Sequence, residues 1–168
     1  MTTNAPGAGQ VEVVREVDAP PEDVWRAWSE PDQIRRWWGP TGFTCPRADV
    51  DLRVGGSTLV TMQAPPEYGG GQIHNRWTFT AVVPPHRLEF VSTFADADGR
   101  PITPAALGIP AGVPDEVPHL VLLEPLPDGR TRLRVVEQGY TDESARSLSE
   151  AGQQQCLDKM QELFGTAR

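Results

Sequence analysis

The sequence lacks an excess of basic residues and any long hydrophobic run. Its 15 Lys and Arg stand against 23 Asp and Glu, so the formal net charge is -8, a balance that repels phosphate backbones and anionic lipid surfaces. No apolar run approaches the roughly 18 residues that a membrane-spanning helix needs. We therefore expect no nucleic acid and no membrane as partners, and we expect a cytoplasmic protein.

The sequence also has few cysteines and no common catalytic or nucleotide-binding motif. Cys45 and Cys156 lie far apart and neither belongs to a CxxC pair, so two buried free thiols are the expected state. There is no GxSxG, no HExxH, no P-loop and no GxGxxG after a strand. We expect no metal and no cofactor.

Composition divides the chain into a short leader and one domain. Residues 1–9, MTTNAPGAG, are small or polar and include Pro and Gly, which predicts a disordered leader. Residues 10–168 have the length of a single domain built around one core.

The order of the predicted elements is a strand, two short helices, six strands in hairpin succession and one long helix. The stretch VEVVREV alternates as a strand. Two short helices follow, each with proline near its start, and the second ends at Gly39. Alternation in RADVDLRV predicts the next strand at 47–54. The last helix is expected from about Thr141 to Phe164, and short connections make the sheet antiparallel.

Residues 95–118 interrupt this succession. The stretch ADADGRPITPAALGIPAGVPDEVP holds so many prolines and glycines that we expect neither helix nor ladder to run through it. A loop of this length inside a compact domain is often a lid.

Nearly the whole chain resembles the SRPBCC superfamily. The resemblance is carried by VEVVREVDAPPEDVWRAWSEPDQIRRWWGPTGFTC, DLRVGGS, VVPPHRLEF, DADGRPITP, DGRTRLRVVEQGYTD and LDKMQELF, in this order. The most similar branch is the one named after the activator of the heat-shock protein 90 ATPase, beside START domains and polyketide cyclases. The resemblance implies an α+β helix-grip fold, in which a curved antiparallel sheet wraps around a long C-terminal helix, with two short helices after the first strand.

This fold implies a hydrophobic cavity between the sheet and the last helix. Members often carry a Trp after the glycine of that helix, where this chain has Gln153 in GQQQCL. The substitution predicts a larger or more polar cavity, of roughly 300 Å³ or more.

Adjacent tryptophans precede Gly39, and neighbouring side chains cannot share one core stripe. We expect Trp37 to pack under the sheet edge and Trp38, with Phe43, to line the mouth of the cavity. Ordinary core and surface packing of both tryptophans is the alternative.

Strand alternation and the helical stripe predict which other side chains face the cavity. The predicted ligand-binding positions besides Trp38 and Phe43 are Val60, Met62, Asn75, Trp77, Phe79, Phe90, Ser92, Phe94, Val121, Leu123, Val135, Gln153, Cys156, Leu157 and Met160.

The same alternation turns His119 and Glu137 inward. An imidazole and a carboxylate in an apolar chamber could pass a proton to or from a substrate, which makes them candidate catalytic residues. Against this, His119 can be a buried structural group, and Glu137 can serve only to hydrogen-bond Tyr140.

Three functions remain open after these exclusions. The first is binding of a small, largely apolar, aromatic molecule in the cavity. The second is a cofactor-free cyclase or dehydratase acting on a polyketide-like or aromatic metabolite. The third is a co-chaperone that activates a heat-shock ATPase through an exposed apolar patch. The expected partner is therefore a small hydrophobic molecule, and a homodimer is left open.

Overall fold

The computed structural model describes residues 9–165. The leader expected at 1–9 lies outside the described residues except for Gly9, whose carbonyl accepts a 3.1 Å hydrogen bond from the Tyr140 amide. Among the described residues, no helix has the length and apolarity required to cross a bilayer.

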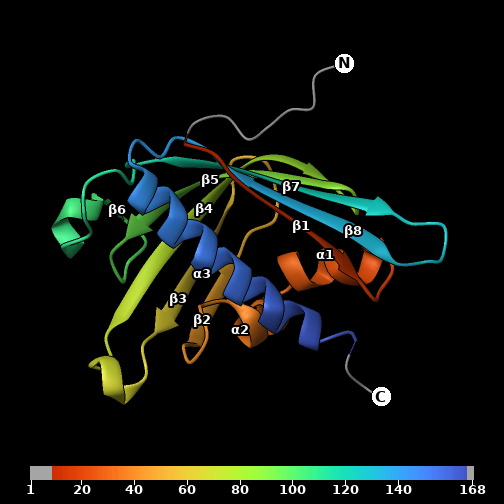
Figure 1. Cartoon of the computed structure of the whole chain (residues 1–168), viewed down its shortest axis with the longest axis horizontal. Helices are drawn as coiled ribbons and strands as arrows, with labels where there is room; N and C mark the ends of the chain where they lie inside the picture. The colour runs from red at the N-terminus through yellow and green to blue at the C-terminus, as the bar shows by residue number, and fades with distance from the viewer. Residues whose placement is uncertain (1–8, 166–168) are drawn as a thin grey trace.

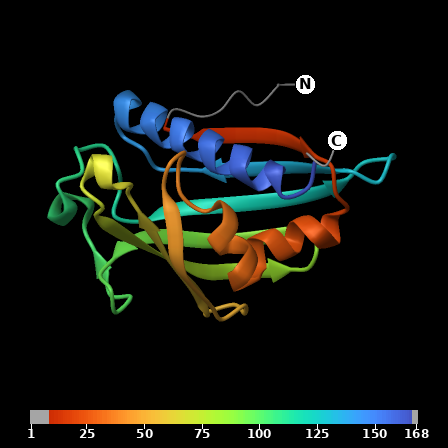
Figure 2. The ribbon, with the colours of Figure 1, turned by 90° about the horizontal axis from the view of Figure 1, so that it is seen from below.

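One antiparallel sheet forms most of the molecule, and it curls around the last helix (Figures 1 and 2). Along the main path the strands lie in the order β1-β8-β7-β5-β4-β3-β2, and β6 pairs with β5 at the side. The strands are β1 (Val11–Val17), β2 (Thr44–Val50), β3 (Ser57–Gln63), β4 (Gln72–Val83), β5 (Arg87–Ala95), β6 (Pro101–Ile102), β7 (Val117–Pro125) and β8 (Thr131–Glu137). Together with α3 (Glu143–Glu162) across the concave face, they confirm the predicted α+β helix-grip fold.

Two short helices follow β1, as predicted. Pro21 opens α1 (Pro21–Ser29) and Pro31 opens α2 (Pro31–Trp37), because a proline at the first helical position removes no intrahelical hydrogen bond. Trp37 is fully buried. Its indole nitrogen donates to the Ala27 carbonyl at 2.7 Å, which joins the two helices.

The long helix α3 is fastened at both ends. Asp142 caps it by accepting a 3.1 Å hydrogen bond from the Ser144 amide. Toward its C-terminal end, Arg15 of β1 donates to Asp158 at 2.8 Å and to Gln161 at 2.6 Å. The helix is two residues shorter at each end than predicted.

Two local predictions were wrong. The strand expected at 47–54 is β2, which begins at Thr44 and ends at Val50, because the Gly56 amide bonds back to the Arg53 carbonyl and closes a turn there. Val54 is consequently 63% exposed. The loop at 95–118 contains β6 and a 3-10 turn at Pro104–Leu107, which the Thr103 hydroxyl caps.

Candidate functional site

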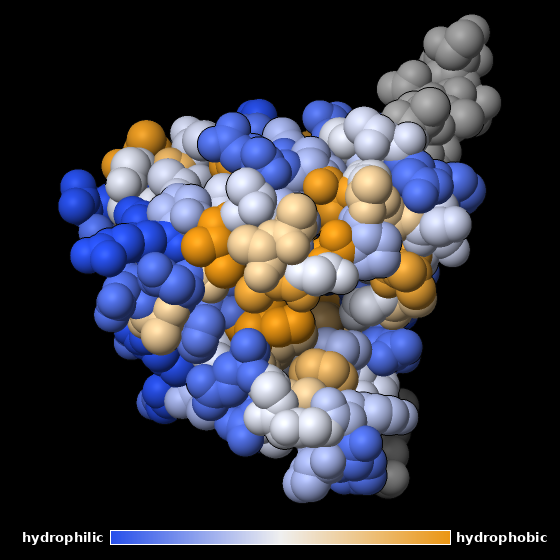
Figure 3. All heavy atoms as spheres, turned by 90° about the vertical axis from the view of Figure 1, so that its left-hand side faces the viewer, coloured by the Kyte–Doolittle hydropathy of each residue, from blue (hydrophilic) through white to orange (hydrophobic). Residues whose placement is uncertain are grey.

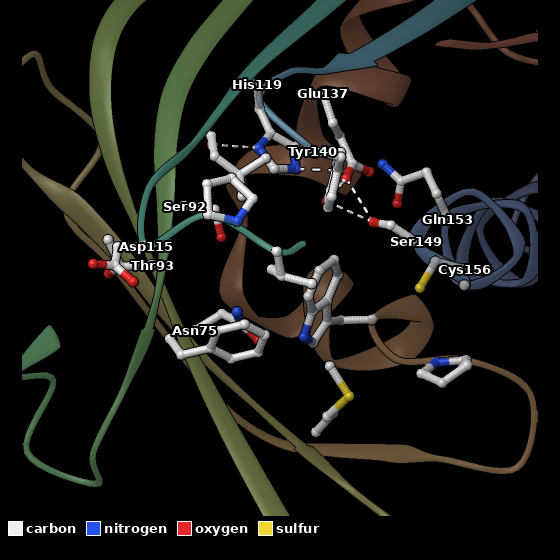
Figure 4. Close-up of a pocket in the computed structure, with 18 residues that line it drawn as sticks. Asn75, Ser92, Thr93, Asp115, His119, Glu137, Tyr140, Ser149, Gln153 and Cys156 are labelled. Atoms are coloured by element: carbon white, nitrogen blue, oxygen red, sulfur yellow. Dashed lines mark hydrogen bonds and ion pairs between the residues drawn. The ribbon is translucent and has the colours of Figure 1, made fainter. Parts of the chain in front are cut away.

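A pocket of about 230 Å³ opens between the concave face of the sheet, α3 and the segment that leads into β7. Figure 3 shows the corresponding face of the molecule, where hydrophobic side chains gather around a hollow. The volume is smaller than the roughly 300 Å³ predicted from the sequence. Tyr140 and Ser149, which the prediction left out, occupy part of the space between sheet and helix (Figure 4).

Part of the predicted site meets in this pocket. The predicted residues that line it are Trp38, Met62, Asn75, Ser92, Phe94, His119, Glu137, Gln153 and Cys156. They come from α3, from the end of α2 and from five neighbouring strands, so the curl of the sheet brings them together.

The other predicted residues are not among those that line the pocket. Phe43 is half-buried beside α2, and its carbonyl accepts a 3.0 Å hydrogen bond from the Lys159 ammonium group. The rest are buried in the core: Val60, Trp77, Phe79, Phe90, Val121, Leu123, Val135, Leu157 and Met160. They lie on the concave side, but other side chains cover them.

An aromatic stack forms the floor beneath the pocket. Trp77 and Phe90 stack with ring centroids 4.8 Å apart, and Phe90 stacks in turn on the His119 imidazole at 4.7 Å. Trp38 meets Trp77 edge-on at 5.1 Å. These contacts fix the orientation of the His119 ring, and therefore the direction in which its Nε2 atom points.

Glu137 is the centre of a buried polar cluster. Glu137 is only 4% exposed. Its Oε1 atom accepts hydrogen bonds from the Tyr140 hydroxyl at 2.6 Å and from the Ser149 hydroxyl at 2.8 Å. The two hydroxyl oxygens lie 2.7 Å apart. Figure 4 shows Tyr140 and Ser149 converging on the carboxylate, with Gln153 of α3 beside them.

His119 completes this end of the pocket. Its Nδ1 lies 2.9 Å from the Val117 carbonyl oxygen. A carbonyl only accepts hydrogen bonds, so Nδ1 carries the hydrogen and Nε2 is left to face the pocket. Nε2 lies 3.8 Å from Oε2 of Glu137, which is longer than a hydrogen bond.

Two groups in the pocket have shifted proton affinities. Burial raises the pKa of the Tyr140 hydroxyl, and the nearby Glu137 carboxylate adds to the shift, so Tyr140 remains a proton donor. Burial raises the pKa of the Cys156 thiol to about 11, which leaves it protonated and weakly nucleophilic at neutral pH. Both cysteines are free and buried, as predicted.

Three polar atoms of the lining have no hydrogen-bond partner among the described residues. They are the Asn75 Oδ1, the Thr93 Oγ1 and the Trp38 Nε1 atoms. Asn75 is only 8% exposed. An unsatisfied buried polar group costs ~1–3 kcal/mol, so an occupant whose polar groups reached these atoms would be stabilised.

The structure contains the hydrogen bond between Tyr140 and Glu137 that was the alternative to a catalytic role, but Tyr140 and several other residues were not predicted to line the site. Tyr140 lies three residues beyond Glu137, past the end of β8, where strand alternation no longer predicts direction. Ser149 is a small polar residue of α3 beside Leu148, which is 70% exposed, so the apolar pattern does not identify it. The lining residues from the loop before β7, which include Val113, Pro114 and Asp115, have no periodicity that could have identified them.

No cluster of three or more metal-ligating side chains occurs within residues 9–165. The polar groups that the site offers are the Glu137 carboxylate, the His119 imidazole and the hydroxyls beside them, set against the aromatic wall.

Comparisons with solved structures extend over almost the whole chain. A crystal structure of a protein from Chromobacterium violaceum is 26% identical, with a TM-score of 0.75 over 94% of this chain and 97% of that one. A solution structure from Arthrobacter aurescens is 28% identical, with a TM-score of 0.75 over 94% and 86%. The AHSA1 protein from Silicibacter pomeroyi, at 22% identity and a TM-score of 0.74 over 95% and 99%, shares the fold.

Sequence comparison gives the family. A search of curated proteins found no match. The profile of the family described as "Activator of Hsp90 ATPase homolog 1-like protein" matches residues 18–165. The chain therefore belongs to this family, within the SRPBCC superfamily.

Proposed function

We propose that the protein binds a small, largely apolar, aromatic molecule in the pocket between the sheet and α3. The observation that carries the proposal is the group of unpartnered polar atoms in the lining, above all the Oδ1 atom of Asn75. A buried carbonyl oxygen without a partner is costly, so an occupant whose donor group reached it would be stabilised there.

The shape and composition of the pocket favour the same class of ligand. A volume of about 230 Å³ accommodates a molecule of one or two rings. Trp38, Met62, Phe94 and Val113 supply the apolar wall. Small-molecule sites are typically concave and apolar with a few polar groups that fix orientation, and this pocket has that composition.

Isothermal titration calorimetry with tryptophol, an indole that carries a two-carbon alcohol, tests the proposal. Asn75→Leu removes the unpartnered oxygen, and because a neutral hydrogen bond contributes about 1 kcal/mol, the affinity is expected to fall roughly fivefold. Gln72→Leu is the matched control, since Gln72 is an exposed amide on the same strand, β4. It should leave the affinity unchanged.

Absence of tryptophol binding, together with no small molecule retained in native mass spectrometry of freshly purified protein, would overturn the proposal. Binding that is equally strong in Asn75→Leu would place the ligand outside this pocket. Either result would favour a function at the surface, such as activation of a heat-shock ATPase.

A second candidate is a cofactor-free enzyme that acts on an aromatic metabolite. The observation that favours it is the proximity of His119 Nε2 and Glu137 Oε2, 3.8 Å apart in a largely buried chamber. Such a pair can move a proton to or from a bound substrate. For an enzyme, Glu137→Gln should lower turnover by about 100-fold; if chromatography finds no conversion by the unaltered protein, binding alone remains.

A further inference from the structure

The inner end of the pocket presents two acceptor atoms to the same space. Both hydrogen bonds to the Glu137 carboxylate end on Oε1, while Oε2 faces His119 Nε2 at 3.8 Å. When the imidazole carries a single hydrogen, the Val117 carbonyl holds that hydrogen on Nδ1, and Nε2 then offers a lone pair. A single nitrogen can lie about 2.9 Å from both atoms, which is the ordinary hydrogen-bond length.

The donors near these atoms are already used. Tyr140 and Ser149 each direct a hydroxyl hydrogen to Oε1. Gln153 lies beside them, and its amide can donate or accept (Figure 4). This end of the pocket is therefore richer in acceptors than in donors.

The charges of the lining have one sign. Glu137 and Asp115 contribute carboxylates, and none of the residues that line the pocket in the described part of the chain is Lys or Arg. Lys159 on α3 donates to the Gly39 and Phe43 carbonyls, and Arg146 binds acidic side chains of its own helix. A buried carboxylate that no Lys or Arg of the described lining neutralises favours a ligand that brings a cation.

We propose that the ligand of this pocket is an arylalkylamine, an amine on a short side arm of an aromatic ring, whose ammonium group is shared by Glu137 Oε2 and His119 Nε2. The inference rests on the proposed function, and it adds the charge of the ligand. An ammonium group has three hydrogens to donate and no lone pair to accept, which matches an acceptor-rich end. The aromatic rings of the wall also attract a cation, in particular the Trp38 indole.

Three probes that differ only in the group on the side arm test the proposal. Tryptamine carries a cationic amine, tryptophol a neutral hydroxyl and indole-3-acetate an anionic carboxylate on the same ring. Because hydrogen bonds to charged groups are about twice as strong as neutral ones, calorimetry at pH 7 should show tryptamine binding at least tenfold more tightly than tryptophol. Indole-3-acetate should bind the most weakly.

Glu137→Gln is the test variant. It keeps an oxygen for Tyr140 and Ser149 but replaces the carboxylate, so the preference for tryptamine over tryptophol should fall to less than threefold while tryptophol binds as before. Glu124→Gln is the matched control, because it makes the same change at an exposed residue of β7 that is not among those lining the pocket. It should keep the preference.

The outcomes separate this inference from the proposed function. Tryptophol that binds as well as tryptamine in the unaltered protein would overturn the amine assignment and leave the aromatic pocket intact. An equal loss of the preference for tryptamine in both variants would mean that the preference comes from the overall negative charge of the protein. That result would also overturn the amine assignment. Failure of all three probes to bind would count against the pocket function itself.

Discussion

The cluster around Glu137 predicts a measurable coupling between Tyr140 and Ser149. Tyr140→Phe removes the 2.6 Å hydrogen bond to Oε1 and keeps the buried ring. Ser149 still donates at 2.8 Å, and the pocket can admit water. We therefore expect Tyr140→Phe to lower the free energy of unfolding by about 1.5 kcal/mol, which is the lower limit for a hydrogen bond to a charged group. Ser149→Ala should cost about 1 kcal/mol, because that side chain is only partly buried.

The double variant should cost more than the sum of the single variants. With both hydroxyls removed, the Oε1 atom of Glu137 loses both of its hydrogen-bond donors, and Glu137 is only 4% exposed. The added penalty of an unsatisfied carboxylate gives a coupling energy of about 1 kcal/mol or more. For a domain of this size, each kcal/mol lowers Tm by about 2–4 °C.

Urea unfolding followed by tryptophan fluorescence measures all four proteins of this cycle. Tyr68→Phe is the control, since Tyr68 is 76% exposed, and it should change the free energy of unfolding by less than about 0.5 kcal/mol. Additive effects within about 0.3 kcal/mol would refute the reasoning, because they would mean that the two hydroxyls do not support the same carboxylate.

Three further variants or reactions test other parts of the pocket. Gln153→Trp should fill part of it and weaken tryptophol binding by at least about tenfold in calorimetry, as overpacking disfavours an occupant. Since burial raises the pKa of Cys156 to about 11 from 9.0, iodoacetamide should alkylate it about 100-fold more slowly than a free thiol at pH 7.5. Its rate, followed by peptide mass spectrometry, should still rise between pH 9 and 10. Gly112→Ala should cost about 2 kcal/mol in urea unfolding, because its φ is +109° and a Cβ would lie 2.4 Å from a neighbouring Cβ.

Each of these expectations has a contradicting result. Unchanged tryptophol affinity in Gln153→Trp would remove the binding site from the neighbourhood of α3. A Cys156 alkylation rate that stops rising at pH 9 would contradict the effect of burial. Gly108→Ala is the control for Gly112, since a Cβ there meets no atom within 4 Å; equal costs would mean that the close contact is unimportant.

The fold could be predicted from the sequence because its elements have clear periods and boundaries. Prolines at positions 21 and 31 begin the two short helices, and alternation identified the long strands. The β2 boundary was placed too late, since the alternation in RADVDLRV continues through Leu52 and Val54. Local turn hydrogen bonds there override the apolar pattern, and a period of two carries no information about them.

The site was less predictable, because alternation gives the direction of a side chain but not its depth. Asn75 and Trp77 point to the same side of β4, yet Asn75 lines the pocket while Trp77 lies in the core. The difference depends on Trp38, whose ring meets Trp77 edge-on. Such coverage is a property of the packed structure. Residues outside regular elements, such as Tyr140, could not be placed by periodicity at all.

The pairing of β1 with β8 has a consequence for the order of events during synthesis. Val11 lies opposite Glu137 and Val17 opposite Thr131 in the finished sheet, so residues 11–17 leave the ribosome more than a hundred residues before their partner. Contacts this distant in sequence form late, because closing a long loop costs entropy before any contact repays it. The wall of the pocket that contains Glu137 is thus completed only when β8 has emerged, and α3 covers it afterwards. Since β8 and α3 follow the other elements along the chain, the pocket is completed after the rest of the sheet.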